Sequence, residues 1–359
     1  MMEQSVLPFK LSVTEDVLTS HGGLALFGEF CVAMKLGEDI DRHLPAPGSG
    51  RGFAPSAYVQ PLVLMLHGGG RSLEDLRMLA GDSGLQSLLG MEVPSADAFG
   101  NWLRRMGAGS GLRGLGDVHR RLLKWALKRE DRKSYTLDID ATEIVAEKRE
   151  AYPTYKGNRG YMPMVGHLAE NALVVHDEFR KGNEAPASRN MAFIEACVAN
   201  MPKGKRIARL RADAATYQAA VINYCERKGI LYAIGAKQDA AVKAAIAAIP
   251  EDRWLPWRDG EIASTVHCMN DTEAFTLLVV RKGRQLELDG TGSGWVYHAV
   301  ATNHPDDAAT VMDWYCKRGE YSENRIKELK LGFGMERMPC GQFAANAVFF
   351  RIGGLAYNL

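Results

Sequence analysis

Residues 133–143, Lys-Ser-Tyr-Thr-Leu-Asp-Ile-Asp-Ala-Thr-Glu, constrain the fold more than any other stretch, because they alternate like a buried strand. Apolar side chains occupy positions 135, 137, 139 and 141, and polar side chains occupy positions 136, 138, 140 and 142. This period of two predicts a strand with one apolar and one polar face. The polar face carries Asp138 and Asp140, and its Asp-x-Thr ending could hold a metal ion. A lone aspartate at a strand end is more often solvated or a helix cap, so a metal site requires matching residues elsewhere.

Two later segments supply such residues. Residues 206–213, Arg-Ile-Ala-Arg-Leu-Arg-Ala-Asp, predict a second strand whose polar face includes Arg211 and ends in Asp213. Residues 315–330 predict a helix, with an apolar stripe on one side and Glu323 on a charged face. Two aspartates and a glutamate, carried in this order by strand, strand and helix, form an acidic triad.

At this point the chain resembles a known family. Asp140 in Asp-Ala-Thr, Asp213 closing a strand, and a helix of the form Tyr-x-x-Arg…Glu-x6-Lys are similar to the DDE transposases of bacterial insertion sequences, of the IS4 type and most closely the IS1380 group. Further segments share the resemblance, which covers most of residues 50–359: Arg71-Ser-Leu-Glu-Asp-Leu, Val93-Pro-Ser-Ala-Asp-Ala-Phe, Gly160-Tyr-Met-Pro-Met and Phe179-Arg-Lys-Gly-Asn. The chain departs from the family in two places. Four residues separate Arg318 from Glu323 where the signature has three, and the resemblance implies a further C-terminal segment after the apolar run 343–359.

The resemblance implies a catalytic site with two Mg²⁺ or Mn²⁺ ions, held by Asp140, Asp213 and Glu323. Asp138 lies on the same face as Asp140 and competes for the role of first ligand, but the Asp-x-Thr context favours Asp140. The resemblance also implies that three residues beside the triad contact the transposon end, the cations by pairing with phosphates: Tyr315, Arg318 and Lys330. An ordinary explanation exists for these cations as well, since lysine is common near a helix C-terminus and Glu-Lys pairs at i, i+4 stabilise isolated helices.

The fold class predicted is α/β, an RNase H-like mixed sheet with a β-rich insertion, preceded by an all-helical N-terminal domain. Residues 1–132 would form the helical, DNA-binding domain, apart from a possible strand at Phe9–Val13, and residues 133–359 the catalytic domain. The order of strand, strand, strand, helix and strand after residue 133 fits an RNase H-like core. The 110 residues from Asp213 to Glu323 exceed what such a core needs, which predicts the β-rich insertion at about residues 240–295.

Two tryptophans in this insertion, Trp254 and Trp257, flank a Leu-Pro pair and lie between two arginines. Related elements pass through a DNA hairpin in which a flipped base stacks on an aromatic side chain, and such stacking contributes about 1–3 kcal/mol per base. The resemblance therefore makes both tryptophans candidates for that stacking. The alternative is that they are core residues, as a tryptophan near a proline more often is.

Charge is balanced overall but uneven along the chain. Lys and Arg number 44 against 43 acidic residues, so net charge argues neither for nor against a nucleic-acid partner. Residues 101–133 nevertheless hold ten basic and three acidic side chains. Helical spacing of the apolar residues there directs Arg120, Lys124 and Lys128 outward. These side chains could neutralise DNA phosphates, although a charged helix face is often simply solvated.

Several features indicate a cytoplasmic protein. The six cysteines show no Cys-x-x-Cys pair, which favours reduced thiols over disulfides or a zinc site. No secretory signal and no run of eighteen apolar residues is evident, so no membrane partner is expected. With the resemblance, this predicts a bacterial, cytoplasmic and nucleoid-associated protein.

The function predicted is that of a DNA transposase. It would bind terminal inverted repeats, cleave the transposon ends and join the 3′-hydroxyl to target DNA, acting as a homodimer that pairs two ends. Two alternatives on the same fold are a catalytically inactive, truncated relic that only binds DNA and a structure-selective nuclease that cuts without joining. A soluble scaffold with no nucleic-acid role is a third.

Overall fold

The computed structural model describes residues 13–48, 50, 52–283 and 295–359. It does not describe the side chains of Glu320, Tyr321 and Glu323. The strand predicted from Phe9 falls, apart from Val13, outside the described residues.

The first part of the chain is helical. Its helices are α1 (Gly22–Ala33), α2 (Leu36–His43), α3 (Ser56–His67), η1 (Leu73–Asp75), α4 (Leu76–Ala80), α5 (Ser83–Leu89), α6 (Ala96–Ala108) and α7 (Gly111–Lys128). Two starts follow from the sequence alone. The Ser95 hydroxyl accepts a hydrogen bond from the backbone N–H of Ala98 and caps α6, and Ser72 with Asp75 forms a capping box at η1.

Strands and helices alternate after residue 133. The strands are β1 (Ser134–Ala141), β2 (Ile144–Val145), β3 (Tyr152–Pro153), β4 (Arg159–Tyr161), β5 (Met164–Leu168), β6 (Val174–Glu178), β7 (Arg206–Ala212), β8 (Leu231–Gly235), β9 (Leu255–Trp257), β10 (Gly260–His267), β11 (Phe275–Lys282) and β12 (Val296–Thr302). The helices are α8 (Asn190–Asn200), η2 (Ala214–Thr216), α9 (Ala219–Lys228), α10 (Ala240–Ala247), η3 (Glu251–Arg253), α11 (Ala308–Lys327), the π-helical turn η4 (Glu328–Gly332) and α12 (Phe343–Tyr357).

Nine strands of the described residues form one mixed sheet, in the order β6-β5-β1-β7-β8-β12-β11-β10-β9. The first three strands in the chain are antiparallel neighbours, β1 with β5 and β5 with β6. The strands β7 and β8 then add on the other side of β1, both parallel to their neighbours. This arrangement of β6-β5-β1-β7-β8 confirms the predicted RNase H-like order of strands.

The predicted β-rich insertion extends this sheet. Strand β12 pairs antiparallel with β8, and β11, β10 and β9 follow it outward. The sequence predicted a β-rich insertion but not the partners of its strands, because the pairing of β12 with β8 joins residues about 70 positions apart in the chain.

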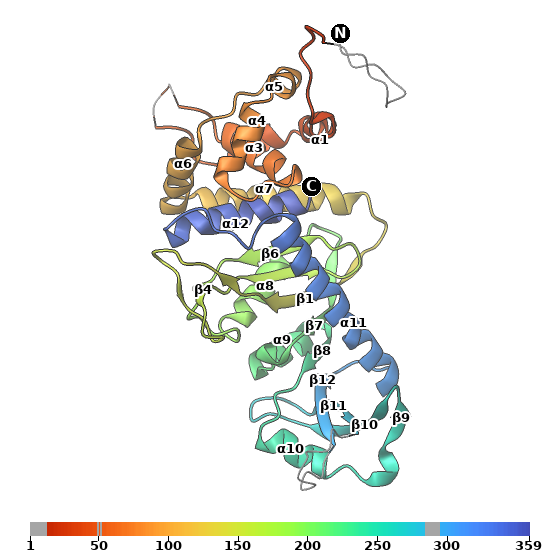
Figure 1. Ribbon diagram of the computed structural model, residues 1–359. Helices are drawn as coiled ribbons and strands as arrows, with labels where there is room; N and C mark the ends of the chain where they lie inside the picture. The colour runs from red at the N-terminus through yellow and green to blue at the C-terminus, as the bar shows by residue number, and fades with distance from the viewer. Residues whose placement is uncertain (1–12, 49, 51, 284–294) are drawn as a thin grey trace, which may run out of the picture.

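Helices cover both faces of the sheet (Figure 1). Alternate residues of β1 and β8, such as Leu137 and Tyr232, are buried with α8, α9 and α10 on one face. On the other face, Ala233 of β8 is buried with Val311 and Met312 of α11. Figure 1 shows α11 running obliquely from the strands β9–β11 past β7 and β1 towards the helical part of the chain.

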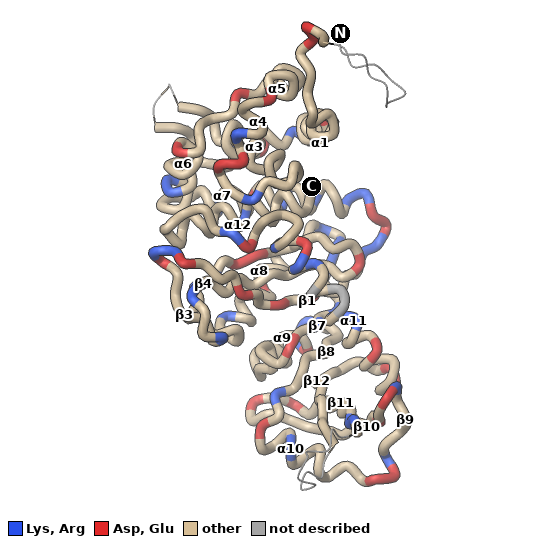
Figure 2. Tube along the Cα trace, in the orientation of Figure 1, with Lys and Arg blue, Asp and Glu red and all other residues tan. Residues whose placement is uncertain are grey.

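Acidic and basic positions both occur along much of the described trace (Figure 2). Within the residues that the structure covers, no helix is both long and apolar enough to cross a membrane.

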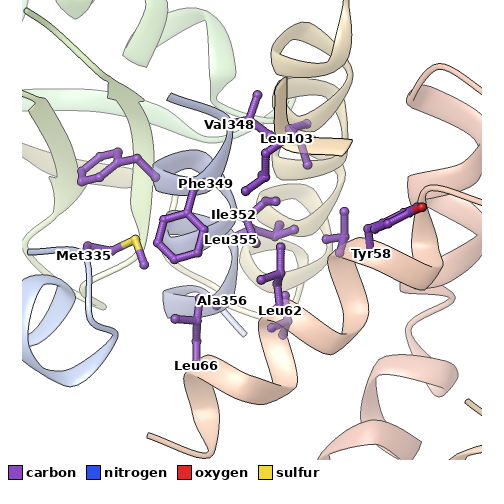
Figure 3. Packing of buried hydrophobic residues seen from close by; sticks show 14 of the residues in the cluster. Tyr58, Leu62, Leu66, Leu103, Met335, Val348, Phe349, Ile352, Leu355 and Ala356 are labelled. Carbon is purple, nitrogen blue, oxygen red and sulfur yellow. The ribbon is translucent and has the colours of Figure 1, made fainter. Parts of the chain in front are cut away.

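The last helix, α12, is part of the core of the N-terminal helices. Figure 3 shows Ile352 and Leu355 of α12 next to Leu62 of α3, and all three are buried in one hydrophobic cluster. At its C-terminal end, the Asn358 side chain accepts a hydrogen bond from the backbone N–H of Val174 and donates one to its carbonyl, both at 2.8 Å. The helix therefore joins the helical part to the edge strand β6, and its packing crosses the boundary predicted at residue 132. The division into residues 1–132 and 133–359 stays a prediction.

The crossing of α12 and α6 depends on a glycine. A Cβ atom at Gly107 would lie 2.5 Å from the backbone carbon of Ala344 and 2.6 Å from its oxygen. Because both atoms belong to the backbone, they cannot move aside as a flexible side chain would. A Cβ atom at Gly100, in the same helix, would lie no closer than 3.7 Å to any atom, the nearest being the tip of the Arg104 side chain.

We predict that Gly107→Ala lowers the free energy of unfolding by about 1–2 kcal/mol, because the steric conflict outweighs the gain in helix propensity. Gly100→Ala gains the same propensity without the conflict and should raise the free energy of unfolding by about 0.5–1 kcal/mol. Urea unfolding followed by circular dichroism measures both. Equal stabilisation by the two substitutions would contradict the close crossing of α6 and α12.

Candidate active site

The parallel pairing of β1 and β7 brings two aspartates together. Ile139 of β1 is paired with Ala212 of β7, so Asp140 and Asp213 follow at the same level on neighbouring strands. Neighbouring strands lie about 4.8 Å apart. Both side chains point to the face covered by α11, because residues two positions earlier, Asp138 and Arg211, contact each other and α11 on that face.

Asp138 is held in a buried ion pair. Its two carboxylate oxygens accept hydrogen bonds from Nε and Nη2 of Arg211, both at 2.7 Å. The exposed fraction of the side chain is 0% for Asp138 and 2% for Arg211, whereas it is 21% for Asp140. With both oxygens engaged and no access to solvent, Asp138 is poorly suited to bind a metal ion, and the geometry favours Asp140 as the first ligand.

Helix α11 brings a cation and a phenol to this pair of aspartates. Nη1 of Arg318 lies 3.7 Å from Oδ2 of Asp140. Burial acts to lower the pKa of Arg318, but attraction to Asp140, Tyr315 and Asp213 outweighs it, and the pKa is raised above its ordinary value. Tyr315 is buried one turn earlier in the helix, and its own pKa is raised, first by burial and also by Asp213.

A glycine at the end of β8 makes room for this tyrosine. A Cβ atom at Gly235 would lie 2.9 Å from the hydroxyl of Tyr315 and 3.1 Å from the backbone nitrogen of Ala214. The predicted residues Asp140, Asp213, Tyr315 and Arg318 are therefore all at one place, where the ends of β1, β7 and β8 meet α11.

Glu323 is in the same helix, five residues after Arg318 and thus about 7.5 Å further along its axis. Its side chain lies outside the described residues, so the third member of the triad is placed by its backbone alone. The α-helix ends at Lys327 and continues as the π-helical turn η4, so Lys330 lies beyond the α-helix that the sequence predicted to reach it.

The described carboxylates suit a hard divalent cation. Oδ1 of Asp213 accepts a hydrogen bond from the backbone N–H of Ala215, which orients the carboxylate at the end of β7. Mg²⁺ and Mn²⁺ prefer oxygen ligands, and Mg²⁺ is commonly bound by one or two carboxylates together with water and substrate oxygens. Among the described side chains no three His, Cys, Asp or Glu residues form a metal cluster. Asp140 and Asp213 therefore fit such an ion as two of its ligands, with water or substrate oxygens completing the set.

Lys330 borders a separate hollow next to the end of β1. Its Nζ donates a hydrogen bond of 2.7 Å to the backbone carbonyl of Glu143, and burial lowers the pKa of its amine. The hollow has a volume of about 290 Å³ and is also lined by Thr142, Lys156 and Glu336. Two lysines thus flank the loop that directly follows Asp140.

The two tryptophans of the insertion are core residues. Trp254 packs in the cluster beneath the sheet, and Trp257 packs with α11. Stacking of either buried ring on a DNA base would require the side chains packed on it to move aside. The guanidinium of Arg281 lies 4.3 Å from the ring centroid of Trp254 and 4.5 Å from that of Trp295, which is 42% exposed. Of the three tryptophans 254, 257 and 295, Trp295 is therefore the exposed one. The sequence did not indicate this difference in exposure.

The predicted basic helix is α7, and Arg120, Lys124 and Lys128 are exposed on it, as the apolar spacing predicted. Arg120 forms an ion pair with Asp117, one turn earlier. Lys124 and Lys128 line an open pocket of about 310 Å³. Its wall also includes Arg121, which pairs with Asp39 of α2 at 2.8 Å.

Two residues of the site were missed from the sequence. Arg211 was assigned to the polar face of its strand, and a cation on the same face as Asp138 could have indicated an ion pair. His298 of β12 stacks on Tyr315, with ring centroids 5.8 Å apart, and burial with the nearby Arg318 lowers its pKa. No local signal marks His298, because its contact depends on the pairing of β12 with β8.

Comparisons with known proteins found a matching family and a solved structure of similar fold. The sequence profile of the family described as Transposase DDE domain group 1 matches residues 8–359. The fold is similar to that in the cryo-EM structure of a piggyBac transposase synaptic complex with hairpin DNA, with a TM-score of 0.51 and 10% sequence identity, over 92% of this chain and 74% of that one. A comparison with curated protein sequences found no match.

His167 makes the stability of the sheet depend on pH. It faces Asp138 across the β1–β5 pair, with Nε2 4.0 Å from Oδ2, and is 1% exposed. Neither ring nitrogen has a hydrogen-bond partner among the described residues. Burial lowers the pKa of His167 to about 4, below the ordinary histidine value of about 6.5. Between these two pH values the His167 ring is neutral in the native state and protonated in the unfolded state.

We predict that protonation of His167 in the unfolded state alone lowers the free energy of unfolding as the pH falls, by about 2 kcal/mol between pH 7 and pH 5. His167→Gln removes the titrating group, so the variant should lose about 2 kcal/mol less than the wild type over that interval. Urea unfolding at the two pH values measures the difference. The same pH dependence in both proteins would show that His167 does not remain neutral in the native state.

Proposed function

Because the chain belongs to the DDE transposase family described as Transposase DDE domain group 1, we propose that it is an active DNA transposase. It binds terminal inverted repeats, hydrolyses a strand at each transposon end, and uses the freed 3′-hydroxyl to attack target DNA. Within the family we assign it to the IS1380 group of IS4-type elements, on the sequence motifs described above, and hence to the cytoplasm and nucleoid of a bacterium.

One observation carries this proposal. Asp140 and Asp213 end two parallel neighbouring strands on the face covered by α11, and α11 is the helix that contains Glu323. Three acidic residues distant in sequence thus belong to elements that meet at one edge of the sheet.

Asp140, Asp213 and Glu323 would hold two Mg²⁺ or Mn²⁺ ions. Such ions activate an oxygen nucleophile, stabilise the leaving oxygen and neutralise phosphoryl charge. Arg318, 3.7 Å from Asp140, is positioned to pair with a phosphate of the transposon end beside the carboxylates, with Tyr315 lining the same place. Lys330 and Lys156 would bind the strand on the other side of the loop that follows β1.

The helical part would add affinity for the duplex. Lys124 and Lys128 of α7 would contact phosphates without reading sequence, and their replacement by glutamine should weaken DNA binding and its dependence on salt concentration. We further propose that two copies act as a homodimer to pair the two ends. Trp254 and Trp257 stay candidates for base stacking in a hairpin intermediate only if the insertion rearranges on DNA.

The test is a cleavage and joining assay on a labelled terminal-repeat duplex with Mg²⁺. We predict that Asp140→Asn, Asp213→Asn and Glu323→Gln each reduce cleavage and joining by at least about 100-fold, because each removes a charged ligand needed in the transition state. DNA binding should be retained. Glu195→Gln, an exposed carboxylate of α8 on the opposite face of the sheet, is the matched control and should be fully active.

The same assay separates the alternatives. A wild-type chain that binds the duplex without cutting it would be a relic that acts only as a DNA-binding protein. Cutting without joining would indicate a nuclease. Failure to bind any DNA at low salt would exclude all three.

A further inference from the structure

We infer that Arg211 is a positioning residue that fixes α11 against the two strands carrying the aspartates. The inference rests on the proposed function for its catalytic consequence. Arg211 is on β7, two residues before Asp213, and its guanidinium is buried. Nε and Nη2 donate to the two oxygens of Asp138 on β1, and Nη1 donates to the backbone carbonyl of Trp314 on α11, all at 2.7 Å.

These three hydrogen bonds reach all three elements of the triad. Asp138 is two residues before Asp140 on the same face of β1, and Trp314 is nine residues before Glu323 in α11. The guanidinium also lies 5.4 Å from the centroid of the Trp314 ring. A single side chain therefore links the strand of the first aspartate, the strand of the second and the helix of the glutamate.

The geometry of this link is specific to arginine. A bidentate contact with Asp138 fixes the plane of the guanidinium, which directs the remaining Nη1 at the helix. The Trp314 carbonyl can accept this bond in addition to its bond within the helix, because a carbonyl oxygen has two lone pairs. Lysine carries the same charge but has no planar fork, so it cannot make the three contacts together.

A contribution to stability alone does not explain why the buried Asp138–Arg211 ion pair is present. Replacement of a buried ion pair by apolar residues of similar volume is often neutral or stabilising, because the charges no longer need to be desolvated. What apolar residues cannot supply is the directional hydrogen bond to α11. Since displacement of a reacting group by about 1 Å can cost about 100-fold in rate, this bond matters for catalysis more than for folding.

The experiment compares the wild type with the double substitution Asp138→Leu/Arg211→Met and with Arg211→Lys. A matched control is Asp177→Leu/Arg351→Met, which replaces a second buried arginine-aspartate pair that joins β6 to α12 and touches none of the triad elements. Amide hydrogen exchange is measured along the chain without DNA. Cleavage of the terminal-repeat duplex is measured as a function of Mg²⁺ concentration.

We predict that the Asp138→Leu/Arg211→Met protein folds and binds DNA within about threefold of the wild type. Its amides in residues 314–327 should exchange at least about tenfold faster while those of β1 and β7 stay protected, and cleavage at saturating Mg²⁺ should fall about 100-fold. Arg211→Lys should show the same pattern. The control protein should keep both the exchange of α11 and the cleavage rate of the wild type.

Wild-type exchange in α11 together with a wild-type cleavage rate in the double variant would overturn the inference. Faster exchange in α11 with undiminished cleavage would overturn its catalytic part. If α11 exchanges faster in the variant but the wild type itself never cleaves, the proposed function fails while the anchoring of α11 by Arg211 is supported.

Discussion

The parallel pairing of β1 with β7 is the constraint on which the rest of the structure depends. It sets Ile139 opposite Ala212, and this register places Asp140 beside Asp213. A shift by one residue would turn one of the aspartates to the opposite face, into the apolar layer formed by α8 and α9. The hydrophobic alternation of both strands excludes that shift, so the packing of the core also sets the arrangement of the carboxylates.

Helix α11 depends on the same register. It crosses the sheet on the face to which the aspartates point, and its first third is held there by apolar contacts and by the Arg211 bond to the carbonyl of Trp314. Beyond α11 the chain passes through η4 into α12, which packs in the core of the first helices. The two ends of the described chain therefore meet in one cluster beside the edge strand β6, and the strands of the insertion extend the sheet at its other edge.

Many of the strands and helices could be predicted from the sequence, because their patterns depend on residues close together in the chain. Alternation identified the strands that carry Asp140 and Asp213, and capping residues marked the start of α6. What could not be predicted depends on pairing between distant segments. The joining of β12 to β8, the contact of Arg211 with Asp138 and the packing of α12 on α3 each leave no periodic signal. The tryptophans show a further limit, since an aromatic suited to stack on a base is equally suited to a core, and the structure buries Trp254 and Trp257 while Trp295 is exposed.

The central claim is that the carboxylates of Asp140, Asp213 and Glu323 bind divalent metal at one site. It is tested most directly by replacing Mg²⁺ with Fe²⁺ and generating hydroxyl radicals, which cut the polypeptide next to the bound ion. The account predicts cuts at three places, beside Asp140, beside Asp213 and in α11 around Glu323, all suppressed by excess Mg²⁺. Cuts beside the two aspartates but not in α11, or cuts that Mg²⁺ does not suppress, would contradict it.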